Sequence, residues 1–147
     1  MGELFRKEAL AIERGTHTWQ EAIEITGKHM LDVGAIEEGY IQAMIDVVNK
    51  VGPYIVLAPH IALAHAAAGT HVLKNDMVLV IFKKPVIFNC ENDPVHLMFG
   101  LCALEQGSHL DLLTNLSLIL DDEDVWEKLL ACENLEELYA LVNKENQ

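Results

Sequence analysis

The chain is poor in basic residues, and those it has are scattered. Its 147 residues include 10 Lys and Arg against 23 Asp and Glu, which gives a formal net charge of −13 and a pI near 4.8. Nucleic-acid binding depends on clustered cations that neutralise phosphates. The composition therefore argues against a nucleic-acid partner.

Long apolar runs and paired cysteines are also missing. No apolar segment approaches the ~20 residues that span a bilayer, and the first residues, MGELFRK, lack the apolar stretch of a signal peptide. We therefore expect a cytoplasmic protein. Cys90, Cys102 and Cys132 include no C-x-x-C pair that would suggest zinc or a redox motif. We expect them to be free thiols with a structural role.

The rest of the composition is typical of a globular fold. Hydrophobic residues make up 51% of the sequence, and a chain of this length can bury a sizeable core. The sequence shows no internal repeat, low-complexity stretch or linker. We therefore expect residues 1–147 to form a single domain.

Apolar residues recur at the spacing of an amphipathic helix in five segments. We expect helices over residues 19–33, 36–51, 109–120, 123–131 and 135–143. Thr18 and Glu21 form a capping box before the first of these segments. Ser108 and Asn134 are predicted N-caps of the third and the fifth.

Short runs rich in β-branched and other apolar residues indicate buried strands. We expect strands at residues 54–58, 77–82 and 95–103. Lys83, Lys84 and Pro85 predict a turn, followed by a short strand at residues 86–88. Near-continuous apolar strands between amphipathic helices indicate a sheet covered on both faces, so we expect an α/β fold, a three-layer α/β/α sandwich.

Three of the seven histidines, His60, His65 and His71, fall within twelve positions. Their neighbours are mostly apolar or small. Small neighbours would let another macromolecule bring a reactive group close, and they expose backbone N–H groups that could hold phosphate oxygens. A histidine in apolar surroundings is more often a hydrogen-bonded structural residue. This pattern alone therefore leaves the role of each histidine open.

A fourth histidine, His109, follows the predicted N-cap Ser108 and so would lie at a helix N-terminus. Unpaired N–H groups and the helix dipole favour anions there, and they disfavour a second positive charge on the ring. A neutral imidazole in this position can donate a hydrogen bond to a phosphoryl oxygen. The structural alternative is a solvent-facing residue of the first helical turn.

Several segments resemble a known family. Residues 52–59, GPYIVLAP, and residues 61–66, IALAHA, resemble the active-site segment of the IIA components of the bacterial sugar phosphotransferase system, in the mannitol/fructose superfamily. The segment GPYIV is most similar to the ascorbate-specific branch. Similar segments of that family match DPVHLMF at 93–99, SHL at 108–110 and GYIQAM at 39–44.

The resemblance implies a mixed-sheet α/β/α fold and the activity of a phosphotransferase that carries a phosphoryl group on histidine. His65 would accept the group from phospho-HPr and pass it to a IIB component, for uptake of ascorbate or a related sugar. His109 matches the second family histidine, which assists the phosphoryl group. The membrane IIC component would be reached only indirectly, and we expect no cofactor and no metal.

Three positions depart from the family pattern. Ala64 stands where the motif usually has proline, and His60 replaces a common glycine. Ala67 stands where the ascorbate-like branch commonly has arginine. Losing a cation near a phosphate weakens its charge stabilisation.

Two other functions remain open from the residues alone. A metal-dependent hydrolase could use His60, His65, His71 and His109, and a related fold could serve as a regulatory module that binds without transferring phosphate.

For the remaining histidines we expect structural roles. His17 and His29 flank or lie on an amphipathic helix, His96 lies in an apolar strand, and we expect His71 in a turn. The acidic stretch at residues 121–124 has no metal-ligand spacing and suits the start of the following helix.

Overall fold

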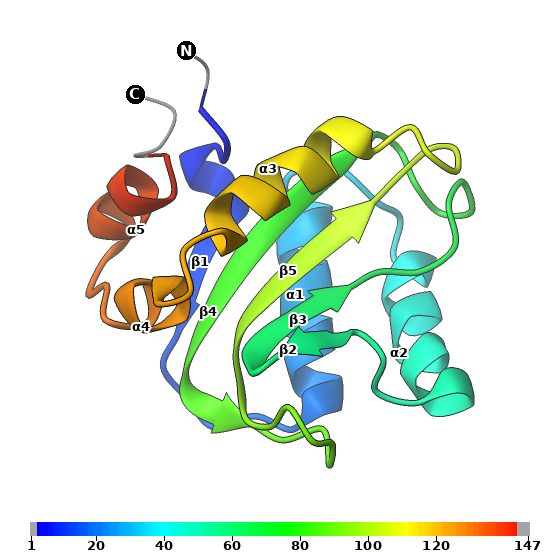
Figure 1. Ribbon diagram of the computed structural model, residues 1–147. Helices are drawn as coiled ribbons and strands as arrows, with labels where there is room; N and C mark the ends of the chain where they lie inside the picture. The colour runs from blue at the N-terminus through cyan, green and yellow to red at the C-terminus, as the bar shows by residue number, and fades with distance from the viewer. Residues whose placement is uncertain (1–2, 144–147) are drawn as a thin grey trace.

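A mixed sheet forms the centre of the fold. The computed structural model describes residues 3–143, and within them five strands lie in the order β1-β4-β5-β3-β2 (Figure 1). The strands are β1 (Leu10–Glu13), β2 (Val56–Ala58), β3 (His60–Ala64), β4 (Asp76–Val86) and β5 (Val95–Cys102). β1 is parallel to β4 and β3 is parallel to β5, whereas the β4–β5 and β2–β3 pairs are antiparallel.

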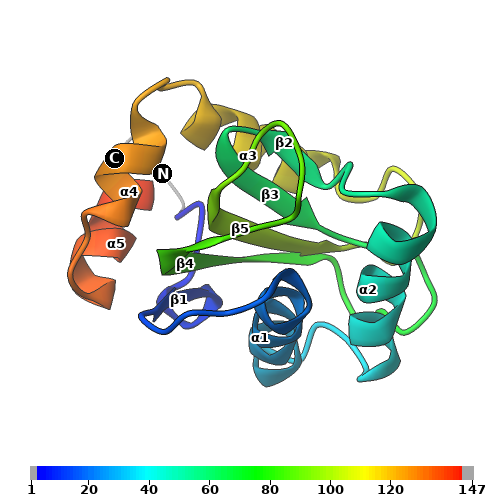
Figure 2. The same ribbon diagram turned by 90° about the horizontal axis from the view of Figure 1, so that it is seen from below.

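Helices cover both faces of this sheet. In the described part of the chain they are the 3-10 helix η1 (Lys7–Ala9) and the α-helices α1 (Trp19–Asp32), α2 (Gly39–Val51), α3 (Leu110–Leu120), α4 (Val125–Leu130) and α5 (Leu135–Val142). Figure 2 shows α1 and α2 on one side of the sheet and α3, α4 and α5 on the other. The expected three-layer α/β/α sandwich and its mixed sheet are confirmed.

Burial follows from this layering. All residues of β5 and the first seven of β4 are buried, as expected for strands covered on both faces. The buried apolar residues form one cluster. All three cysteines are free thiols, and two of them are buried. In the described residues, no helix is long and apolar enough to cross a membrane.

The structure confirms two of the predicted helix N-termini. Thr18 and Glu21 form the expected capping box, and Asn134 caps α5 through the N–H of Glu137. The second helix begins at Gly39 rather than at residue 36. Ile36 instead forms an isolated β-bridge with Val72, which holds this part of the chain extended before the helix starts.

The strand predictions placed a turn where β4 continues, and they missed two strands. The turn predicted at Lys83, Lys84 and Pro85 does not form, because β4 runs on to Val86 with a shift of register against β5. Pro85 is tolerated because β1 pairs with β4 only as far as Phe82, so no second strand requires its missing N–H. The strands β1 and β3 were not predicted at all. β1 has four residues, and β3 is rich in alanine, which has little strand propensity.

Close packing of α1 on β5 gives a first testable prediction. A Cβ atom at Gly100 would lie 2.7 Å from Cγ2 of Thr26 and 2.8 Å from Sδ of Met30, so α1 would have to move away from the sheet. We expect Gly100→Ala to lower the free energy of unfolding by about 1–3 kcal/mol, measured by denaturant titration.

Gly15→Ala is the matched control for this substitution. A Cβ atom there would meet only the ring of His17, at 3.4 Å, so the change should leave the free energy of unfolding within about 0.5 kcal/mol of wild type. Equal stability of the two variants would contradict the packing described for β5.

Candidate functional site

His65 directly follows the C-terminal end of β3, and a backbone carbonyl orients its half-buried ring. Its Nδ1 lies 2.8 Å from the carbonyl oxygen of Leu63. A carbonyl oxygen can only accept, so Nδ1 carries the proton of the neutral ring and Nε2 keeps its lone pair. The ring is therefore held in the tautomer that a nucleophilic Nε2 requires.

A pocket of about 490 Å³ opens beside His65. Its walls come from the loop after β3 (residues 66–68), the end of β5 (residues 101–103) and the segment that leads into α3, with Glu105, Gln106 and His109. β3 and β5 are parallel, so their C-terminal ends meet at one edge of the sheet, near the start of α3 (Figure 1). Ligands bind at such edges in open α/β sheets.

His109 brings the second imidazole into the same pocket. It occupies the N-cap position of α3, and the first intrahelical bond runs from the N–H of Leu113 to its carbonyl oxygen at 3.1 Å. The N–H groups of the first turn have no partner within the helix, which favours an anion at this end. The buried Nδ1 of His109 also has no hydrogen-bond partner among the described residues. An anion in the pocket could satisfy these groups.

The predicted N-cap role of Ser108 is wrong. Its hydroxyl accepts from the N–H of Glu105 at 3.1 Å and lies 2.7 Å from the carbonyl oxygen of the same residue. The Asn75 side chain joins this turn, accepting from the N–H of Leu104 at 2.7 Å and donating to the Ser108 carbonyl at 3.0 Å. Ser108 therefore stabilises the loop that carries His109, and the helix begins one residue later.

His60 lies far from the pocket although it is close to His65 in sequence. His60 begins β3 and His65 follows its last residue, which separates them by about 16 Å along an extended strand. The His60 ring stacks on Trp126 with centroids 3.6 Å apart. Burial lowers the pKa of His60, and neighbouring His96 adds to this effect, so the neutral ring is favoured.

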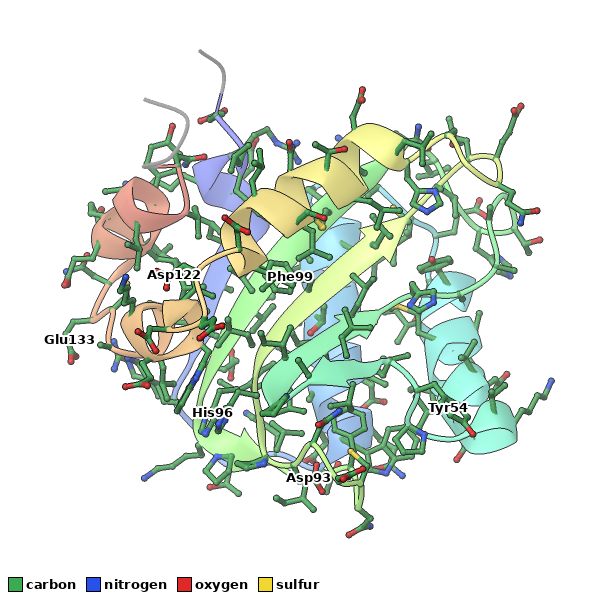
Figure 3. The ribbon with its side chains drawn as sticks, in the orientation of Figure 1. Tyr54, Asp93, His96, Phe99, Asp122 and Glu133 are labelled. Atoms are coloured by element: carbon green, nitrogen blue, oxygen red, sulfur yellow. The ribbon has the colours of Figure 1, made fainter. Side chains whose placement is uncertain are left out.

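His71 and His96 have structural surroundings. His71 lies in a turn, as predicted, with its Nδ1 3.5 Å from a carboxylate oxygen of Glu37. His96 is buried and its Nδ1 lies 2.8 Å from the Phe82 carbonyl oxygen, which confirms a satisfied core histidine. Figure 3 shows His96 at the end of the sheet away from the start of α3.

The four-histidine cluster that a metal-dependent hydrolase would need is therefore not assembled. His65 and His109 share the pocket, whereas His60 and His71 do not line it. Among residues 3–143, no group of three or more His, Cys, Asp or Glu side chains is arranged to hold a metal ion. The described lining residues also include no Lys or Arg, in keeping with Ala67 at the position where the ascorbate-like branch commonly has arginine.

Sequence reasoning missed Tyr40, which lines the pocket from α2. Its hydroxyl accepts from the N–H of Ala66 at 2.9 Å and lies 2.9 Å from the carbonyl oxygen of Leu101. Tyr40 belongs to the segment GYIQAM, which carries part of the family resemblance. Nothing in the spacing of that segment indicates that a hydroxyl there reaches the loop after β3, 26 residues later in the chain.

The position of His60 gives a second prediction. We expect His60→Gly to leave the rate of any reaction at His65 within about twofold of wild type, because its ring is remote from the pocket. His60 has a φ of 75°, a conformation that glycine adopts without strain. The measurement is the rate of labelling of the variant from a phosphorylated donor, and a loss as large as that of His65→Ala would contradict this separation.

Comparison with known proteins agrees with the family resemblance seen in the sequence. Residues 3–145 match the family described as "Phosphoenolpyruvate-dependent sugar phosphotransferase system, EIIA 2". The mannitol-specific cryptic phosphotransferase enzyme IIA component of Escherichia coli (strain K12) is 31% identical over 144 residues, 98% of each chain. The solution structure of the mannitol-specific cryptic phosphotransferase enzyme IIA from Escherichia coli matches this structure with a TM-score of 0.85 and 32% identity, with 96% of each chain covered.

Two further relatives are an ascorbate-specific component and a IIA enzyme solved in complex with a IIB enzyme. The ascorbate-specific PTS system EIIA component of Shigella boydii serotype 4 (strain Sb227) is 31% identical, covering 97% of this chain and 94% of the relative. The Escherichia coli complex of enzyme IIAMTL with phosphorylated enzyme IIBMTL matches with a TM-score of 0.80 and 30% identity, over 94% of this chain and 96% of that one. The chain therefore belongs to the EIIA 2 family of the phosphoenolpyruvate-dependent sugar phosphotransferase system, whose members are phosphoryl-carrying phosphotransferases.

Proposed function

We propose that His65 accepts a phosphoryl group from phospho-HPr and passes it to a IIB component, for uptake of ascorbate or a related sugar. The observation that carries this proposal is the hydrogen bond from Nδ1 of the pocket-lining His65 to the Leu63 carbonyl, which in the neutral ring leaves the lone pair on Nε2. The family supplies the reaction type. Its relatives include both mannitol-specific and ascorbate-specific components at 31% identity, and the GPYIV segment favours the ascorbate branch.

In the first step the lone pair of Nε2 attacks the phosphorus atom. A bond forms between Nε2 and phosphorus while the bond between phosphorus and the donor's nitrogen breaks, and that nitrogen keeps the electron pair. Such transfers have a loose transition state, so they depend on in-line positioning and on donors to the equatorial oxygens. The second step reverses the roles, with a cysteine thiolate of the IIB component as the expected acceptor.

Neutral donors would hold the phosphoryl oxygens in this site. The described lining residues include no Lys or Arg, so we assign this task to the ring of His109 and to the unpaired N–H groups at the start of α3. A neutral His109 ring can donate one hydrogen bond to an oxygen. Without an arginine clamp, each of these donors matters more to the transfer rate.

The proposed partners follow from the same reasoning. The solved complex of a relative pairs a IIA enzyme with a phosphorylated IIB enzyme. We infer that this chain also acts as one domain and meets HPr and a IIB component in the cytoplasm. The membrane IIC component would be reached only through IIB.

The test is a reconstituted relay. The protein is incubated with phosphoenolpyruvate, enzyme I and HPr, and the phosphorylated product is then offered separately to a mannitol-type and an ascorbate-type IIB protein. We expect transfer to the ascorbate-type acceptor. Faster transfer to the mannitol type would overturn the sugar assignment, and phosphorylation with no transfer to either would favour a regulatory module.

A further inference from the structure

The buried hydroxyl of Tyr40 joins three segments at the edge of the pocket. Tyr40 lies at the start of α2 and is 1% exposed. Its hydroxyl accepts from the N–H of Ala66 at 2.9 Å and donates to the carbonyl oxygen of Leu101 at 2.9 Å, with the Ala66 carbonyl oxygen at 3.2 Å. Burial raises the pKa of Tyr40 to about 12, so the hydroxyl keeps its proton.

The bond to Ala66 acts directly on the backbone of His65. The N–H of Ala66 belongs to the peptide plane that follows the Cα atom of His65, so holding this N–H anchors the backbone on the C-terminal side of the Cα that carries the ring. β3 ends at Ala64, and the ladder with β5 therefore gives His65 no support on its C-terminal side. The next backbone bond across this loop runs from the N–H of Gly69 to the Ala103 carbonyl, at 2.9 Å.

The same hydroxyl also bonds the neighbouring wall of the pocket, at the end of β5. Leu101 and Cys102 are the last residues of β5, and the chain then enters the loop that carries Glu105 and His109. Because one hydroxyl bonds both Ala66 and Leu101, it sets the distance between the loop after β3 and the end of β5. It also occupies the N–H of Ala66, so this group is not free to hold a phosphoryl oxygen.

We propose that Tyr40 is a positioning residue for phosphoryl transfer, whose hydroxyl fixes the peptide after His65 against the end of β5 and thereby aims Nε2 into the pocket. The proposal rests on the proposed function of His65. It assigns Tyr40 no contact with the transferred group. Its effect is on the geometry of the nucleophile, and a displacement of about 1 Å at a reacting atom can cost ~10²-fold in rate.

Tyr40→Phe removes the hydroxyl and keeps the ring that packs in the core. We expect kcat for transfer from phospho-HPr to fall ~10–100-fold. KM for phospho-HPr should stay within about twofold, because the surface that a donor protein contacts is unchanged. Incorporation of 3-fluorotyrosine at position 40 keeps a hydroxyl and should restore most of the rate.

Two controls separate positioning from general loss of stability. Tyr139→Phe also removes a tyrosine hydroxyl, one that bonds Glu3 outside the pocket, and should keep the wild-type rate. Ile81→Val removes a methyl group from the centre of β4 and should lower the melting temperature without slowing transfer. A rate for Tyr40→Phe that falls only as far as its folded fraction, or a rise in KM with kcat unchanged, would overturn the proposal.

A spectroscopic readout keeps this proposal apart from the proposed function. In ¹⁵N-labelled protein without any partner, Tyr40→Phe should shift and broaden the ring signals of His65, whereas Tyr139→Phe should not. Unchanged His65 signals would overturn the role of Tyr40 whether or not transfer occurs. Absence of labelling at His65 in the wild type, with the shifted signals present, would instead overturn only the function proposed for His65.

Discussion

Replacement of His65 by alanine is expected to abolish the acid-labile phosphoryl label that the wild-type protein acquires from phosphoenolpyruvate, enzyme I and HPr. The reason is that His65 lines the pocket and that, in its neutral ring, the bond from Nδ1 to the Leu63 carbonyl leaves Nε2 as the nitrogen with a free lone pair. The reaction needs this atom as its nucleophile. Labelling with radioactive phosphoenolpyruvate, followed by alkaline gel electrophoresis, measures the loss.

The matched control for this loss is another histidine replaced in the same way. His29 lies on α1 and does not line the pocket, so His29→Ala should label at the wild-type rate. Label that survives in folded His65→Ala would show that another group is the acceptor. Since His109 shares the pocket, the double variant with His65→Ala and His109→Ala would then show whether the surviving label depends on His109.

The second large effect is expected at His109, which should assist transfer without becoming the acceptor. Its ring lines the pocket at the N-terminus of α3, where a neutral imidazole can donate to an oxygen while the unpaired N–H groups favour the negative charge. Loss of one preorganised donor typically costs ~10²–10³ in rate. Because this pocket is open to partner proteins, we expect His109→Ala to lie near the lower end, about 10²-fold slower.

Rapid-quench measurements of transfer from phospho-HPr and onward to a IIB protein would test this expectation. His109→Ala should still be labelled at His65 after long incubation. His109→Gln should recover part of the rate, because its amide can donate a hydrogen bond. Wild-type rates of His109→Ala in both directions would show that His109 is structural, and the site would reduce to His65 and its backbone donors.

Much of the fold could be predicted because its signals are local. The capping box of Thr18 and Glu21 and the cap at Asn134 depend on residues three positions apart, and both are present. The continuous apolar character of β5 likewise follows from burial on both faces. The strand β3 gave no such signal, since its alanines form a strand only because β2 and β5 pair with it.

The site was harder to predict because its contacts are distant in sequence. Ser108 carries the usual side chain of an N-cap, but Asn75, 33 residues earlier, draws it into the preceding loop, and the helix begins after His109. Spacing also grouped His60 with His65, although a strand of intervening residues separates their rings. The predicted helix N-terminus pointed to His109, but only the family resemblance distinguished His65 from its neighbours in sequence, and only the structure shows that both line one pocket.

The central claim is that one histidine, His65, carries the phosphoryl group. It is tested most directly by mass mapping of peptides from the wild-type protein after incubation with phosphoenolpyruvate, enzyme I and HPr, under alkaline conditions that preserve phosphohistidine. The account predicts a single phosphoryl group on His65 that is lost on acid treatment. Stoichiometric label on His60 or His71, or label that withstands acid, would contradict it.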